Sequence, residues 1–409
     1  MAQLNKDDLE SLLHPEFGND LVVESFTSKA LTQPGENYGS TMLALEVNIV
    51  QDSTKRKQKL SLVAKLVPPS EFLWKMFNTP NTFCKEINCY TILKEEFEKL
   101  QKERGISKDK FLDIFPKCYG ARTTLAKEIG PIADKNGVLL LENLKESNYC
   151  LGNRRLGLDL NHTKLAVSQL ARFHAISIAI KLLKPQVFEQ TILKAIRPFQ
   201  TGLTKKEMED NNKSLLESVM TIPEYKKYLG KLEIVFQESL ENYLNHFPEA
   251  KEPFGTIGHL DFWVNNMMFC YDTDKRPIGI KFIDFQLAEY ISPARDLIFF
   301  LYSSTAEGVI ENWYEMLIQL YHQNFINCLS DLGCDITPFS FQSFLDEIDE
   351  MAPHEINHIL YMLRVICGAE EGVKELADVR NDTLFPETNA IFENRAKIFL
   401  RDFVKRGWF

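Results

Sequence analysis

The sequence lacks the features of a membrane-spanning or secreted protein. No run of about 18 apolar residues occurs, so no membrane span is predicted. The most apolar long stretch, residues 166–183, contains Gln169, Arg172, His174 and Lys181, which is typical of a helix in a soluble protein. The first residues include neither a basic region nor an apolar core. We therefore expect no secretory signal. The cysteine usage described next predicts a reducing, cytoplasmic location.

Cysteine pairs with the spacing of metal or redox sites are also missing. The eight cysteines form no Cys-x-x-Cys pair, and no His/Cys group has the spacing of zinc ligands. This argues against a disulfide scaffold and against a zinc protein. Internal repeats and low-complexity tracts are absent as well, so repeat architectures are not expected.

Basic residues are fewer than acidic residues in this chain. The chain has 47 Lys+Arg against 57 Asp+Glu, a formal net charge of −10. This balance argues against a protein that coats nucleic acid or anionic membranes, and no nucleic-acid partner is expected. It does not exclude a local basic pocket for a phosphate. With 44% hydrophobic residues, the 409-residue chain is long enough to bury a large core.

The first third of the chain has alternating patterns typical of β-strands. Residues 42–50 alternate apolar and other side chains, which predicts a strand with one buried face. Residues 51–59 are polar and indicate a hairpin connection. Residues 60–67 predict the second strand, with Lys65 on the face opposite the leucines. A short apolar run at 138–141 is consistent with a buried strand.

One long helix interrupts these strands, and helices dominate the rest. Residues 81–101 have apolar side chains at helical spacing, with Glu86 at the edge of that stripe. Beyond about residue 150 the pattern is mainly helical, apart from a short β-interlude at 256–286. This order predicts an α+β protein of two lobes, residues 1–148 and 149–409.

The chemically distinctive residues lie in and around the β-interlude. His259, Asp261 and Asn266 have the spacing H-x-D-x-x-x-x-N, and Asp284 follows two apolar runs joined by a turn-rich segment. A hairpin folds back, so it brings Asp261, Asn266 and Asp284 together at one end. This cluster suits phosphoryl transfer from a nucleotide. One carboxylate orients an attacking hydroxyl, while the Asn oxygen and the second carboxylate hold Mg²⁺.

Several motifs make this interpretation more specific. They are GENYGS at 35–40, FCKE at 83–86, LARFHA at 170–175, HLDFWVNN at 259–266, FIDFQ at 282–286 and SPARDL at 292–297. Together they resemble the insect ecdysteroid-kinase-like family, also called choline-kinase-like, in the small-molecule branch of the protein-kinase-like superfamily. The resemblance extends over nearly the whole chain. It implies a bilobal protein-kinase-like fold with a β-rich N-lobe and a mainly helical C-lobe.

The resemblance implies a role for each matched residue. Asp261 would be the catalytic acid-base or orienting residue, and Asn266 and Asp284 would be Mg²⁺ ligands. Lys65 would contact the α- and β-phosphates of ATP and pair with Glu86. ATP and Mg²⁺ are therefore the implied cofactors.

Two further segments of the first lobe would contact the nucleotide. The residues implied to cover the phosphates are Gly35, Asn37, Gly39 and Ser40. Those implied to form the hinge, whose backbone would hold the adenine, are Glu142, Asn143 and Leu144.

Three departures from the family or kinase pattern are informative. Leu260 stands where the family usually has Gly, and a positive φ at this position would strain the loop. Gln286 replaces the Gly that follows Asp-Phe in protein kinases, and the phosphate loop has no G-x-G-x-x-G. These last two features belong to the small-molecule branch and argue against a protein kinase.

Four neighbouring residues are interpreted as structural. We expect His259 to fix the catalytic loop by hydrogen bonding rather than to act as a base. His174 is interpreted as a satisfied core histidine. Asp296 is either a helix cap or, by analogy with the family, a brace for the catalytic loop. Trp263 either packs against the hairpin, which we favour, or lines the acceptor pocket.

The leading hypothesis is an ATP- and Mg²⁺-dependent phosphotransferase whose partner is a small hydroxylated molecule. The resemblance points to a lipophilic alcohol such as an ecdysteroid or a xenobiotic. One alternative is a choline or ethanolamine kinase, which needs a cage of acids and aromatics. Another is a pseudokinase that binds nucleotide or a lipophilic ligand and regulates a partner, which only Leu260 favours.

Overall fold

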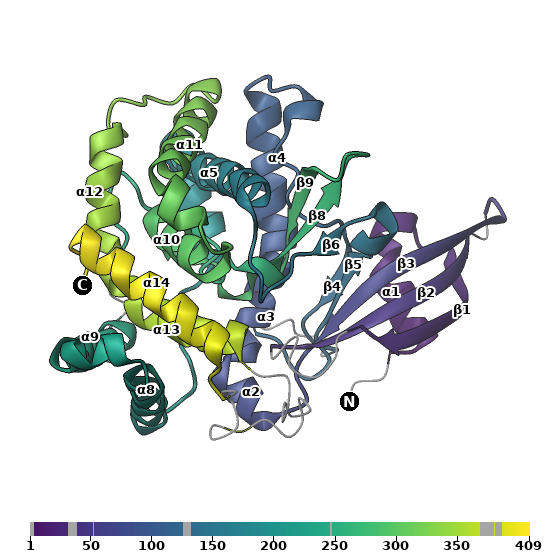
Figure 1. Cartoon of the computed structure of the whole chain (residues 1–409). Coiled ribbons are helices and arrows are strands. Elements are labelled where there is room, and N and C mark those ends of the chain that lie inside the picture. Colours follow the sequence, from purple (N-terminus) through teal and green to yellow (C-terminus); the bar gives the residue numbers. More distant parts are fainter. Residues whose placement is uncertain are drawn as a thin grey trace.

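The computed structural model describes residues 4–31, 39–51, 53–125, 132–245, 248–368, 380 and 387–409. Figure 1 shows an antiparallel sheet formed by the first part of the chain and a mainly helical body formed by the rest. The predicted α+β architecture is therefore confirmed. The division at residue 148 stays a prediction.

The sheet has five antiparallel strands in the order β1-β2-β3-β5-β4. The strands are β1 (Leu21–Ala30), β2 (Thr41–Gln51), β3 (Arg56–Leu66), β4 (Cys118–Arg122) and β5 (Val138–Glu142). Strands β2, β3 and β5 confirm the predicted ones, whereas β1 and β4 were not predicted. The β2–β3 connection is shorter than expected, because Arg56 already pairs with Gln51.

A separate hydrophobic core lies on the face of the sheet away from the helical body. Helix α1 (Lys6–Phe17), which the sequence did not predict, contributes Leu9 and Leu13 to it, and the strands contribute Leu45 and Leu62. These four side chains are fully buried. Leu45 and Leu62 lie opposite each other on β2 and β3 and point into this core. Lys65 follows Leu62 by three residues on β3, and side chains alternate along a strand, so Lys65 points to the opposite face of the sheet.

The helix predicted at 81–101 is present as three consecutive pieces, α3 (Thr79–Asn88), a π-helical turn (Cys89–Leu93) and α4 (Lys94–Glu103). Its apolar side chains do not join the core of the sheet. Phe83, Tyr90 and Phe97 belong to the larger core of the helical body, where Phe97 contacts Phe173 with ring centroids 5.7 Å apart. The long helix is therefore anchored in the helical body.

Helix α5 (Leu160–Leu183) runs through the centre of that body beside α11 (Val309–Asp331) (Figure 1). Among the described residues it alone is long and apolar enough to cross a membrane by length and composition. The most apolar window of α5 is 67% buried inside the protein, as expected for a core helix. The remaining long helices are α8 (Lys205–Met220), α9 (Leu229–Leu244), α10 (Pro293–Ser304), α12 (Phe341–Met351), α13 (Ile356–Cys367) and α14 (Ala390–Arg406).

The predicted β-interlude contains β7 (Thr256–Gly258), β8 (Met267–Tyr271) and β9 (Pro277–Phe282). Strand β10 (Glu289–Ile291), just beyond the interlude, was not predicted. Strands β8 and β9 form the predicted hairpin, with Met267 opposite Phe282. The pairing continues beyond the strands, where the Ile283 N–H donates to the Asn266 carbonyl at 2.9 Å. The two ends of the hairpin therefore lie side by side.

A segment of the helical body, residues 195–202, runs along α2 (Glu71–Met76) and α3. Five hydrogen bonds of 2.6–3.1 Å join the two. The donors and acceptors are Lys85 Nζ to Arg197 O, Asn88 Nδ2 to Ala195 O, Asn78 Nδ2 to Gln200 O, Thr201 Oγ1 to Met76 O and Gly202 N to Lys75 O. The position of α3 is thus fixed by the helical body through both apolar and polar contacts.

Candidate active site

Lys65, Glu86 and Asp284 meet in the cleft between the sheet and the helical body. Lys65 lies on β3, Glu86 on α3, and Asp284 two residues beyond the end of β9. The Lys65 Nζ is 2.6 Å from Glu86 Oε2 and 2.8 Å from Asp284 Oδ1. The predicted pairing of Lys65 with Glu86 is therefore present, and Asp284 joins it.

Burial gives this cluster its electrostatic character. The side chains of Lys65 and Glu86 are only 3% and 1% exposed. Burial disfavours the Lys65 charge, but Asp284 and Glu86 outweigh this effect and raise the pKa of the amine. Burial also raises the pKa of Glu86, against the attraction of Lys65. Lys65 therefore keeps its proton and forms a fixed cation in the cleft.

Asp284 is held by its backbone as well as by its carboxylate. Its φ of 66° places it in the left-handed region, which Asp tolerates better than most residues. Its N–H donates to the Tyr90 hydroxyl at 3.2 Å, and Tyr90 packs edge-on against Phe285. Sequence reasoning placed Tyr90 in the apolar stripe of the helix and missed this contact, because periodicity reports burial rather than partners.

Asp261 and Asn266 are joined at the start of the hairpin. The Asn266 amide nitrogen donates to the Asp261 carbonyl and to its Oδ2, both at 2.8 Å. Burial raises the pKa of the Asp261 carboxyl to about 7, and the charge of Asp284 adds to the rise. Because the nitrogen of the Asn266 amide is used, its oxygen is the atom left for a ligand.

The loop that carries Asp261 is braced by Asp296 of α10. The Asp296 carboxylate accepts from the backbone N–H groups of His259 at 2.6 Å and of Leu260 at 2.8 Å. It also contacts His174 Nε2 at 3.1 Å, and His174 Nδ1 lies 2.6 Å from the Tyr321 hydroxyl. The interpretation of His174 as a satisfied core histidine is confirmed, and Asp296 is a brace rather than a helix cap.

His259 is likewise structural. Its Nε2 is 3.0 Å from the Ile283 carbonyl, which can only accept, so this nitrogen carries the proton. Burial lowers the pKa of the imidazole, which keeps the ring neutral. His259 therefore ties the catalytic loop to the end of the hairpin at Ile283.

Leu260 has a φ of 59°, the left-handed conformation in which a side chain is strained. We expect Leu260→Gly to be about 1 kcal/mol more stable to unfolding than Leu260→Ala, because only glycine avoids the Cβ clash. Denaturant unfolding of both variants measures the difference. The alanine variant is the control for loss of the leucine side chain, and equal stability of the two would show that the backbone is not strained.

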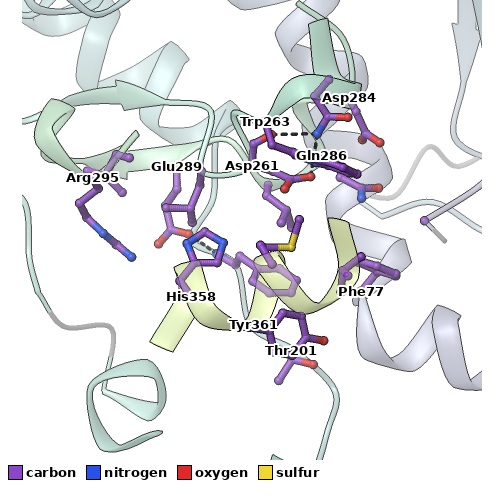
Figure 2. A pocket seen from close by; sticks show the side chains of 18 of the residues that line it. Phe77, Thr201, Asp261, Trp263, Asp284, Gln286, Glu289, Arg295, His358 and Tyr361 are labelled. Carbon is purple, nitrogen blue, oxygen red and sulfur yellow. Dashed lines mark hydrogen bonds between the residues drawn. The ribbon is translucent and has the colours of Figure 1, made fainter. Parts of the chain in front are cut away.

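All described residues of the predicted site line one cavity of about 1810 Å³, except Ser40. Figure 2 shows Asp261 in the middle of this pocket, with Asp284 and Gln286 on one side and Glu289, Arg295 and His358 on the other. Trp263 is 9% exposed and also lines the cavity. It therefore combines the packing role that we favoured with a place in the pocket wall.

The segment predicted to cover the phosphates is described in part. Gly35 and Asn37 lie outside the described residues. Gly39 lines the cavity beside Gln286, where a Cβ would come within 2.6 Å of the Gln286 amide nitrogen. Ser40 is fully buried just before β2 and is not part of the cavity wall.

The predicted hinge lies at the end of β5, and all three of its residues line the cavity. The Glu142 carboxylate accepts from the Lys117 N–H at 2.8 Å, and the Asn143 amide donates to the Ser61 hydroxyl at 3.1 Å. These contacts turn both side chains toward the protein. The backbone N–H groups of Glu142 and Asn143 are also bonded within the protein, to the Lys117 carbonyl at 2.9 Å and the Ser61 carbonyl at 3.3 Å. The adenine-holding role of this hinge stays a prediction.

A metal site in this cleft would have few protein ligands. Across the described ranges, no group of three or more His, Cys, Asp and Glu side chains is arranged to hold a metal ion. Asn266 and Asp284 supply one amide oxygen and one carboxylate. This donor set fits Mg²⁺, which favours oxygen ligands and completes its shell with water and phosphates.

A sequence model of the ecdysteroid kinase-like family matches residues 34–334. The match includes Lys65, Glu86, Asp261, Asn266 and Asp284, the residues that converge in the cleft. The chain belongs to the ecdysteroid kinase-like family. This is a kinase-like phosphotransferase family, so the resemblance seen in the motifs is confirmed.

Two other comparisons relate this ecdysteroid kinase-like chain to solved structures and to curated proteins. It is similar to the crystal structure of a spectinomycin phosphotransferase in complex with ADP and spectinomycin, at 13% identity and a TM-score of 0.38. That similarity covers 88% of this chain and 98% of the other. Among curated proteins, none matches the chain.

Proposed function

We propose that this protein transfers a phosphoryl group from ATP to a hydroxyl of a lipophilic alcohol, such as an ecdysteroid or a xenobiotic, with Mg²⁺ as cofactor. One observation carries the proposal. The buried Lys65–Glu86–Asp284 cluster and the Asp261–Asn266 pair converge on one cavity, which continues into a largely apolar chamber. The geometry thus combines groups for phosphates with space for an apolar acceptor.

Each polar group has a role that follows from its position. Lys65 is a fixed cation and would stabilise charge on the phosphate oxygens. Asp261 would align the acceptor hydroxyl and take its proton, a task suited to a carboxyl with a pKa of about 7. Asn266 and Asp284 would hold Mg²⁺, which supplies charge neutralisation at the phosphates when bound.

The acceptor chamber supports the choice of a lipophilic alcohol. Pockets for single drug-sized ligands commonly measure about 300–1,000 Å³, so a cavity of about 1810 Å³ has room for a nucleotide and a sizeable acceptor. The acceptor chamber is the part of this cavity beyond Asp261, and its wall includes apolar side chains from α8, α9 and α13 and from the segment 195–202. They are Met208, Ile234, Val235, Met362, Val365, Ile196 and Phe199.

Mg·ATP is expected to stabilise the protein against thermal unfolding. At about 100 times its Kd a ligand of the folded state adds about 2.7 kcal/mol, which raises the Tm by several degrees. Differential scanning fluorimetry with ATP, with and without Mg²⁺, measures the shift. No shift with Mg·ATP would contradict nucleotide binding at this site.

A panel of acceptors then tests the reaction. Steroid alcohols, long-chain alcohols, choline, ethanolamine and sugars are incubated with Mg·ATP, and phosphorylated products are detected by mass spectrometry. We expect products from steroid or other lipophilic alcohols. Phosphorylation of choline or ethanolamine alone would support the amine-kinase alternative. Mg·ATP binding without any product would support the pseudokinase alternative.

A further inference from the structure

His358 is a polar group of the acceptor chamber that the sequence motifs do not include. It lies in the first turn of α13, outside the residues 34–334 that match the family. Its side chain lines the same cavity as Asp261 (Figure 2). Sequence reasoning missed it because only the Glu-x-x-His spacing of residues 355–358 marks it, and such spacing is common on helices.

The imidazole is fixed in place on two sides. Its Nδ1 is 2.9 Å from Glu355 Oε2, and its ring stacks on Phe299 with centroids 4.1 Å apart and planes 5° from parallel. Glu355 is 1% exposed and is held in turn by Arg295 Nε at 2.5 Å. The buried Glu355 carboxylate therefore joins two residues of the cavity wall, Arg295 and His358.

This chain determines which nitrogen of His358 carries its proton. Burial opposes the ionisation of Glu355, but Arg295 and His358 outweigh it and hold the pKa at about 2. The Glu355 carboxylate can then only accept, so Nδ1 is the donor. With Nδ1 as the donor, the neutral tautomer of His358 has its lone pair at Nε2, and no hydrogen bond to this atom is formed within the described part of the chain.

The surroundings of the ring suit recognition of a hydroxyl. The charged or titratable groups that line the cavity with His358 include Asp261, Glu238, Glu289, Arg295, His354 and Tyr361, while the cavity wall as a whole is largely apolar. A lone pair on a fixed imidazole accepts from a hydroxyl but offers nothing to a quaternary ammonium, which has no N–H.

We propose that His358 is a specificity-determining residue whose Nε2 accepts a hydrogen bond from a second hydroxyl of the acceptor. Asp261 aligns the hydroxyl that is phosphorylated, so the preferred acceptor carries at least two hydroxyls. The inference rests on the proposed function and adds to it the polar pattern of the substrate.

The test compares His358→Phe with wild type on steroid alcohols that share one ring skeleton. One probe has a single hydroxyl, and the others are diols that differ in the position of the second hydroxyl. We expect wild type to favour at least one diol over the mono-alcohol by about tenfold in kcat/KM, the value of one well-made hydrogen bond. In His358→Phe this ratio should fall to about 1, mainly through KM.

Two further variants separate recognition from structure. Phenylalanine keeps the stacking on Phe299, and His358→Gln, which retains an acceptor, should keep part of the diol preference. If His358→Phe does not fold, His358→Gln still tests the proposal, because its diol preference should lie below that of wild type. His322→Phe is the matched control, because this imidazole lies outside the cavity with its Nε2 on the Phe339 carbonyl at 2.8 Å. It should keep the wild-type ratio.

The outcomes distinguish this inference from the function on which it rests. If wild type phosphorylates the steroids and His358→Phe keeps the wild-type ratio, the inference is wrong and the proposed function stands. The same holds if His322→Phe loses the preference equally. If wild type phosphorylates none of the steroids, the proposed acceptor class fails and the inference fails with it.

Discussion

Asp261→Asn is expected to lower kcat about 100-fold to 10,000-fold, while Mg·ATP binding is retained. Asparagine has the shape of aspartate and can still contact the Asn266 amide, but it cannot take a proton from the acceptor hydroxyl. The substitution also replaces a carboxyl whose pKa is raised to about 7 by burial and by Asp284. The variant is therefore not expected to lose stability at neutral pH, so its inactivity would not reflect unfolding.

The measurement combines kcat for a steroid alcohol with the Tm shift caused by Mg·ATP. Asp274→Asn in the exposed turn of the β8–β9 hairpin is the matched control, since the same substitution there removes a carboxylate far from the acceptor chamber. It should keep the wild-type kcat. An Asp261→Asn variant with the wild-type kcat would show that the assignment of Asp261 is wrong.

Lys65→Met is expected to abolish activity and to lower the free energy of unfolding by about 3–5 kcal/mol. The cation sits between two carboxylates, at 2.6 Å from Glu86 and 2.8 Å from Asp284, with Lys65 and Glu86 almost fully buried. Removing it leaves Glu86 without a counter-charge in the protein interior. Urea unfolding and the kinase assay measure the two effects separately.

A second substitution separates the structural role of Lys65 from its role toward phosphates. In Lys65→Met/Glu86→Gln the buried carboxylate is gone, so much of the lost stability should return. Activity should not return, because no cation faces the phosphates. Lys59→Met is the control on the same strand, since Lys59 forms an exposed pair with Glu46 and should change stability little. Recovery of activity in the double variant would contradict the assignment.

The core of the site could be predicted because its residues follow local patterns. Strand alternation placed Lys65 opposite the leucines, and the edge of a helical stripe marked Glu86. A hairpin between two apolar runs brought Asn266 next to Asp284. For Leu260, the resemblance to the family marked a position where a positive φ would strain the loop, and φ is indeed 59°.

The remaining contacts could not be predicted, because they join segments that no local pattern connects. His358 reaches the cavity from a helix near the end of the chain, and Arg295, which holds its partner Glu355, lies on α10. Tyr90 holds Asp284 from within a helix whose pattern indicates only burial. Periodicity identifies the face that a side chain occupies, whereas partners depend on how distant elements pack.

Because α3 is anchored in the helical body, the Lys65–Glu86 ion pair connects the sheet to that body. Lys65 belongs to the sheet, whereas Glu86 is fixed to the helical body through the packing of Phe83 and the bonds to residues 195–202. Any opening of the cleft must draw the Lys65 amine away from Glu86. The same 195–202 segment supplies Phe199 to the acceptor chamber. The distance between Lys65 and Glu86 therefore reports how far the cleft is closed, and the segment that fixes Glu86 also lines the acceptor chamber.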